Sequence, residues 1–90
     1  MAWWAGDVQL EGVVTFVGTF HALRSEQCVK RAALVCRLIP SPRELHSSCA
    51  VSLAFEAAAV RHIAEVIARN RIHHEGIYLY DVGGLQRWIG

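Results

Sequence analysis

The order of the apolar segments limits the folds open to this chain more than any other property of the sequence. Four runs rich in β-branched and aromatic residues indicate strands, at residues 13–17, 34–39, 51–55 and 77–80. Two stretches with helical periodicity separate them, at about residues 20–33 and 56–70. The clearest helical stripe lies in the second stretch and consists of Val60, Ile63, Ala64 and Ile67.

The resulting order is β-α-β-β-α-β, which in a short chain typically forms a ferredoxin-like α+β sandwich. We therefore expect a four-stranded antiparallel sheet with two helices on one face. Strand alternation places Leu34, Cys36 and Leu38 toward the helices and Arg37 in solvent.

Right-handed crossovers would bring three connections to one edge of this sheet, at residues 18–21, 40–49 and 69–76. These connections contain four of the five histidines and the loop cysteine, in the set His21, Arg43, His46, Cys49, His73 and His74. The opposite edge has no comparable group. This asymmetry predicts a functional site at the edge that contains Cys49.

Composition points to one compact domain over residues 1–90, with a core at about 13–82 and a short extension at each end. The chain is 53% hydrophobic and has a net charge of +1 from nine basic and eight acidic residues. The scattered arginines and the balanced charge argue against nucleic-acid binding. The Trp3-Trp4 pair could cover a sheet edge or contact a second copy, which leaves a homodimer open.

The first residues lack the basic and apolar regions of a signal peptide, and no apolar run reaches the ~18 residues of a membrane span. We therefore expect a cytoplasmic protein with no membrane partner. The three cysteines form neither a CxxC pair nor a zinc pattern, so free thiols and no cofactor are expected. Cys36 and Cys28 are interpreted as core residues.

The connection at residues 40–49 contains two prolines and three serines but no glycine, so it should be stiff. Its Ser41-Pro42-Arg43-Glu44 run matches a helix start, with Ser41 as N-cap and Glu44 reaching back in a capping box. We expect one helical turn here, which would bring Cys49 to the first position of the next strand. The cationic and hydroxyl groups near Cys49 could stabilise its thiolate, the reactive form.

Four segments also match a known pattern. They are Thr19-Phe20-His21-Ala22-Leu23 with Glu26, Arg37-Leu38-Ile39-Pro40-Ser41-Pro42-Arg43-Glu44, Ser47-Ser48-Cys49, and Glu75-Gly76-Ile77-Tyr78. Together they resemble the selenium/sulfur carrier-like family, whose members are small domains of otherwise unknown function. The resemblance runs from about residue 13 to 80 and places the family's cysteine at Cys49 and its histidine at His21. Ala50 replaces the family's usual glycine, and His46 replaces its usual serine.

The resemblance implies that Cys49 holds sulfur or selenium as a persulfide or selenopersulfide and exchanges it with donor and acceptor proteins. Such a protein is a carrier and not an enzyme. The residues expected to support Cys49 or to bind an anion are His21, Arg43, Glu44, His46, Ser47 and Ser48. Arg43 could instead pair with Glu44 to brace the loop, and His21 could be a helix-start residue without a chemical role.

Two other functions remain open from the residues alone. The first is a metal-binding module built from Cys49 and the clustered histidines, although no histidine pair has zinc-motif spacing. The second is a ferredoxin-like interaction domain in which Cys49 is buried and inert.

Overall fold

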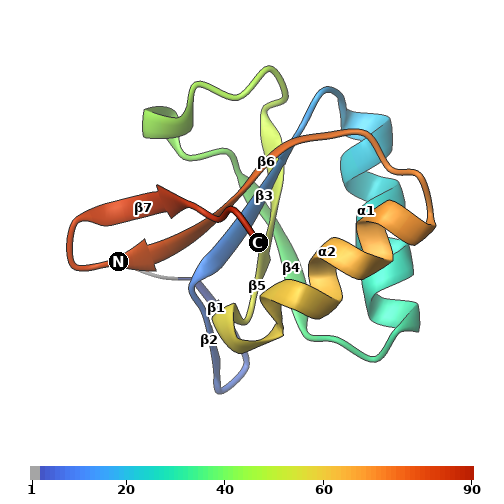
Figure 1. The fold of residues 1–90 in the computed structure, drawn as a ribbon, viewed down its shortest axis with the longest axis horizontal. Helices are drawn as coiled ribbons and strands as arrows, with labels where there is room; N and C mark the ends of the chain where they lie inside the picture. The colour runs from blue at the N-terminus through green and yellow to red at the C-terminus, as the bar shows by residue number, and fades with distance from the viewer. Residues whose placement is uncertain (1–2) are drawn as a thin grey trace.

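The structure is a computed structural model that describes residues 3–90 (Figure 1). Its strands are β1 (Trp3–Ala5), β2 (Val8–Leu10), β3 (Gly12–Phe16), β4 (Cys36–Pro40), β5 (Val51–Phe55), β6 (His74–Asp81) and β7 (Gly84–Arg87). Its helices are α1 (Thr19–Arg31) and α2 (Val60–Arg69), with short 3₁₀ turns η1 (Arg43–Leu45) and η2 (Ala57–Ala59). The four strands and two helices expected from the sequence are therefore present.

The main sheet has five strands in the order β4-β5-β3-β6-β7, and every neighbouring pair is antiparallel. The α+β class with two helices is confirmed, but the four-stranded ferredoxin-like layout is wrong. The additional strand β7 pairs with β6 across a two-residue turn, Val82-Gly83. Gly84 has a φ of 101°, and the Gly83 amide donates to Asp81 Oδ1 at 2.7 Å. These turn features let the chain reverse just after the predicted strand at residues 77–80 and add β7 beside β6.

The N-terminal extension is also ordered, since β1 and β2 form a separate two-stranded sheet. The hairpin turns at Gly6-Asp7, where Gly6 has a φ of 61°, a conformation that glycine adopts without strain. The short extension expected before the core therefore contains a hairpin, from Trp3 to Leu10. Its first two residues lie outside the described part of the chain.

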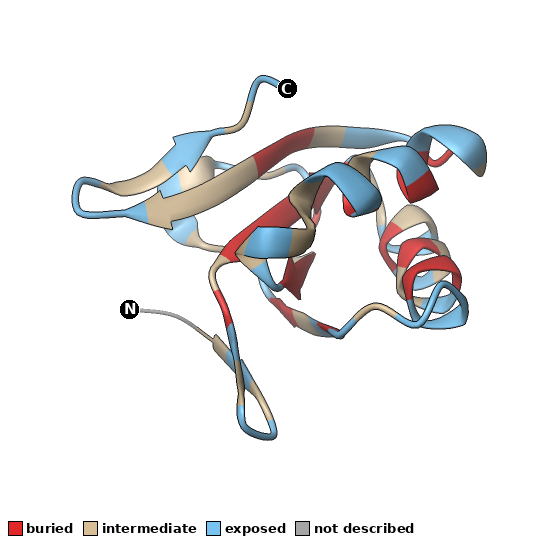
Figure 2. Ribbon diagram, turned by 60° about the horizontal axis from the view of Figure 1, so that its bottom comes forward, coloured by how far each residue is buried: buried red, intermediate tan, exposed pale blue. Residues whose placement is uncertain are grey.

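The two faces of the main sheet are covered by different elements (Figure 2). Both helices pack on one face, where Phe16, Phe55 and Ile63 are fully buried in the larger core cluster. The β1–β2 hairpin covers part of the other face, where a smaller cluster includes Leu10 and Val13. Because β3 lies between the two clusters, all five of its residues are buried.

Alternation within the strands agrees with the prediction. Cys36 and Leu38 belong to the helix-side cluster, whereas Arg37 is exposed and donates from Nη1 to the Trp4 carbonyl oxygen at 3.0 Å. Packing favours a residue without a side chain at position 12, since a Cβ on Gly12 would lie 2.3 Å from the Phe55 ring.

The helix ends differ in detail from the expected ones. Gly18 is the N-cap of α1, and α1 ends at Arg31, before the expected end at about residue 33, which leaves Ala32 and Ala33 exposed. Asn70 is the C-cap of α2, and its Nδ2 donates to the Val66 carbonyl oxygen at 2.8 Å. Within residues 3–90, neither helix has the length and apolar character that crossing a membrane requires.

Candidate functional site

The loop between β4 and β5 contains the expected helical turn, η1, but not the expected capping box. Pro42 takes the N-cap position without a side-chain bond, and His46 ends the turn in the left-handed region at φ 49°. Ser41 instead donates its hydroxyl proton to the Cys49 carbonyl oxygen at 2.6 Å. Because a serine has one hydroxyl proton, Ser52 must be the donor in the 2.6 Å bond between Ser52 Oγ and Ser41 Oγ. Ser41 thus ties the two ends of the loop together.

Cys49 lies at the end of this loop, two residues before β5 and not at its first position. Its Sγ accepts from the Val51 amide at 3.5 Å and lies 3.7 Å from Thr19 Oγ1. The Cys49 amide in turn donates to Ser47 Oγ at 3.2 Å. Thr19 is the first residue of α1, so the sulfur lies beside a helix N-terminus, whose partial positive charge favours an anion.

The loop borders an open pocket of about 500 Å³, and Cys49 is one of its lining residues. Its lining residues are Ser41, Pro42, Arg43, His46, Ser47, Cys49 and Ala50. Arg43, His46 and Ser47 are thus brought together with Cys49 as the sequence suggested. Cys49 itself is only 4% exposed, which restricts direct access to its sulfur.

Glu75 in β6 binds the loop through Ser47 and Ser48 and was not expected as a site residue. Its carboxylate accepts from Ser47 Oγ at 3.0 Å, from the Ser48 amide at 3.2 Å and from Ser48 Oγ. The Ser48 hydroxyl is the main cause that holds the pKa of Glu75 below its ordinary value, against a smaller opposing effect of burial. The Ser47 hydroxyl and the Ser48 amide lower this pKa further. One indication of this role was present in the sequence, since Glu75 belongs to the Glu75-Gly76-Ile77-Tyr78 segment that resembles the family.

Three of the expected site residues lie outside the pocket lining: His21, Glu44 and Ser48, whose hydroxyl donates to Glu75. His21 is half-buried, its Nδ1 has no hydrogen-bond partner, and its ring centroid is 5.1 Å from that of His73. Glu44 is exposed. The pKa of Tyr80 is raised by burial and, to a smaller extent, by the negative charge of Glu44. Within the described residues, no ion pair joins Arg43 to Glu44.

A metal centre finds no support in the part of the chain that the structure describes. No group of three or more histidine, cysteine, aspartate or glutamate side chains is placed to hold a metal ion there. His46, His73 and His74 are all exposed.

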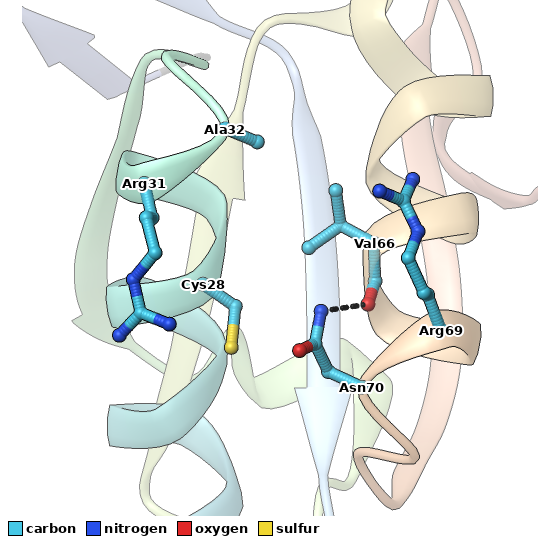
Figure 3. A pocket seen from close by; sticks show the side chains of 6 residues that line it. All are labelled: Cys28, Arg31, Ala32, Val66, Arg69 and Asn70. Atoms are coloured by element: carbon cyan, nitrogen blue, oxygen red, sulfur yellow. Dashed lines mark hydrogen bonds between the residues drawn. The ribbon is translucent and has the colours of Figure 1, made fainter.

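The other two cysteines lie in the core, as predicted. Burial raises the pKa of Cys36 to about 11, against an opposing effect of Lys30. Cys28 lies on the wall of a separate pocket of about 230 Å³ between α1 and α2, together with Arg31, Val66 and Asn70 (Figure 3). Neither cysteine lies at the loop pocket.

A comparison with protein families matches residues 11–79 to the family described as "Putative Se/S carrier protein-like". The chain therefore belongs to this family, and the resemblance seen in the sequence is confirmed. The matched span contains Cys49, its loop and Glu75, and it ends before β7. No curated protein and no solved structure matches the chain.

Proposed function

We propose that this protein carries sulfur or selenium on Cys49 as a persulfide or selenopersulfide and exchanges it with donor and acceptor proteins. Family membership supports a carrier role and implies contact with other proteins. The observation that carries the proposal is the setting of Cys49 Sγ, which faces the Val51 amide and the Thr19 hydroxyl, in a residue that lines the open loop pocket.

Loading would be a sulfur exchange without net oxidation. The Cys49 thiolate attacks the outer sulfur of a donor persulfide, a new sulfur–sulfur bond forms on Cys49, and the donor thiolate leaves. Delivery is the same reaction in reverse, with an acceptor thiolate attacking the outer sulfur and the Cys49 thiolate leaving. The Val51 amide and the Thr19 hydroxyl can both donate to an anionic sulfur, and bonds to charged groups are stronger than neutral ones.

The pocket suits a bound chalcogen. Its volume of about 500 Å³ has room for one further sulfur or selenium atom beyond Cys49 Sγ. Arg43 and His46 line the same space and supply groups that can attract an anionic persulfide. The low exposure of Cys49 keeps its own side chain largely out of contact with bulk solvent.

That same low exposure also supports a second candidate, an interaction domain with an inert cysteine. The two functions differ in what happens at Cys49 when a sulfur donor is supplied. A carrier gains one sulfur on this residue, whereas an interaction domain gains none.

The test compares the reduced wild-type protein with Cys49→Ser, using Cys28→Ser as a matched control. Each is incubated with glutathione persulfide, and intact-protein mass spectrometry measures the gain of sulfur. Wild type and Cys28→Ser should each gain one sulfur atom, and Cys49→Ser should gain none. Equal loading of Cys49→Ser would refute the proposal, and circular dichroism of each variant checks the fold.

A further inference from the structure

Two segments that are distant in the sequence share the smaller core cluster on the sheet face opposite the helices. Its buried members are Leu10, Val13, Ile39 and Ala54. The β1–β2 hairpin packs against this cluster through Trp3, Ala5 and Val8. Leu45, the last residue of η1, packs against the same cluster. The hairpin and the helical turn of the Cys49 loop are therefore joined through one set of apolar contacts.

Tyr80 in β6 is a second connection between the hairpin and η1. Its ring centroid lies 5.5 Å from that of Trp3, with the two ring planes tilted by 40°, a favourable distance for an aromatic pair. The pKa of Tyr80 is raised mainly by burial and, to a smaller extent, by the negative charge of Glu44, the middle residue of η1. Tyr80 thus contacts Trp3 and lies near η1.

The turn η1 is also part of the wall of the Cys49 pocket. Arg43 begins the turn and His46 follows it, and both residues line the pocket. Two amides, those of Leu45 and His46, close the turn on the Pro42 and Arg43 carbonyl oxygens. So short a 3₁₀ segment depends on packing for its position. Because Cys49 is 4% exposed, a movement of this wall changes how readily another molecule reaches its sulfur.

We propose that Trp3 is a positioning residue for the Cys49 pocket: packed on Tyr80 and the smaller core cluster, it holds the hairpin and η1 together and so limits access to the sulfur. Trp3 precedes the family match, which begins at residue 11, so this control of access lies outside the matched span. The consequence for sulfur exchange rests on the proposed carrier function, whereas the effect on access does not.

The test measures the rate at which N-ethylmaleimide alkylates each cysteine of the reduced, folded protein. The thiolate adds to the maleimide double bond and water supplies the proton, so no oxidant is needed. Digestion followed by mass spectrometry gives a separate rate for each of the three free cysteines. Cys36 is the internal reference, since it is buried beneath α1 and is reached only when the larger core opens.

In Trp3→Ser, Cys49 should react about tenfold faster than in wild type, as expected for losing the contacts of one half-buried aromatic side chain. Cys36 should stay unlabelled while Cys49 reacts. Trp4→Ser is the matched control, because Trp4 is the neighbouring residue, is 52% exposed and does not pack on the cluster. This control should react like wild type.

A double-mutant cycle distinguishes a shared contact from two separate effects. Leu45→Ser should also speed the reaction of Cys49. The double variant Trp3→Ser with Leu45→Ser should react about as fast as the faster single variant, because either substitution releases the same contact. If Trp3 and Leu45 acted independently, the two accelerations would multiply.

Four results would overturn the role of Trp3. These are an unchanged Cys49 rate in Trp3→Ser, an equal acceleration in Trp4→Ser, accelerations that multiply in the double variant, and labelling of Cys36 together with Cys49 in Trp3→Ser, which would mean that the chain unfolds. Faster alkylation of Cys49 in Trp3→Ser, in a protein whose Cys49 gains no sulfur from glutathione persulfide, refutes the carrier function alone and supports the role of Trp3.

Discussion

Replacing Cys36 with alanine should reveal how strongly the fold opposes ionisation of this core thiol. Its pKa is raised from 9.0 to about 11 because the side chain is buried beneath α1. Between these two values the unfolded chain has lost the Cys36 proton while the folded chain retains it. Stability from this group is therefore fully present below the unfolded pKa and is lost as pH rises toward the folded pKa.

One pKa unit corresponds to about 1.4 kcal/mol. Around pH 10 the two-unit shift should therefore lower the free energy of unfolding of wild type by about 1.4 kcal/mol relative to neutral pH. Cys36→Ala lacks this titration and should not show this part of the loss. Tyr80, whose pKa burial also raises, is present in both proteins and cancels in the comparison.

The assay is urea unfolding of both proteins in reductant at several pH values from neutral to about pH 10. The quantity of interest is the difference in unfolding free energy between wild type and Cys36→Ala, since any cavity cost in the variant is the same at each pH. A difference that does not change with pH would show that Cys36 ionises as readily in the folded chain as in the unfolded one, which would refute the assignment of Cys36 as a buried, inert thiol.

Three further predictions concern the loop, the Cys49 site and the core. Glu75→Gln should weaken the attachment of the loop by about 1 kcal/mol and speed hydrogen exchange at the Ser48 amide, and unchanged exchange would contradict the role of Glu75. Because the pKa of Glu75 is lowered, its stabilising effect in wild type should be lost as pH falls through that lowered value. Thr19→Val should slow alkylation of Cys49 about fivefold without unfolding the protein, as expected for losing one hydrogen bond to the sulfur, and an unchanged rate would remove Thr19 from the site. Gly12→Ala should destabilise the protein by about 1–3 kcal/mol in urea unfolding, since its Cβ would overlap the Phe55 ring, and a neutral result would show that this ring can move aside.

The inner strands and both helices could be predicted because their burial follows local periodicity. Alternation along β4 and the stripe on α2 are set by which side chains face the helix-side core. The strands β1, β2 and β7 are three or four residues long and carry too little pattern to be recognised. Only the glycines at their turns indicated that the chain reverses there.

The site could be predicted in part, for a similar reason. Arg43, His46 and Ser47 share one loop with Cys49, so their proximity follows from the sequence. The role of Glu75 could not be predicted, because its bonds to the loop span 27 and 28 residues.

The predicted capping box at Ser41 and Glu44 does not form, because a tertiary hydrogen bond takes the place of the local one. Ser41 has a single hydroxyl proton, and the fold directs it to the Cys49 carbonyl oxygen. A local helix start would have required Ser41 to face η1 instead.

The most direct test of the carrier function is to locate the sulfur on the wild-type chain. The reduced protein is exposed to a labelled persulfide donor, washed free of it and digested, and mass spectrometry measures the label on each of the three cysteines. The carrier function predicts label on Cys49, transferable to an added thiol, with Cys28 and Cys36 unlabelled. Label spread evenly over the three cysteines, or absent from Cys49, would contradict it.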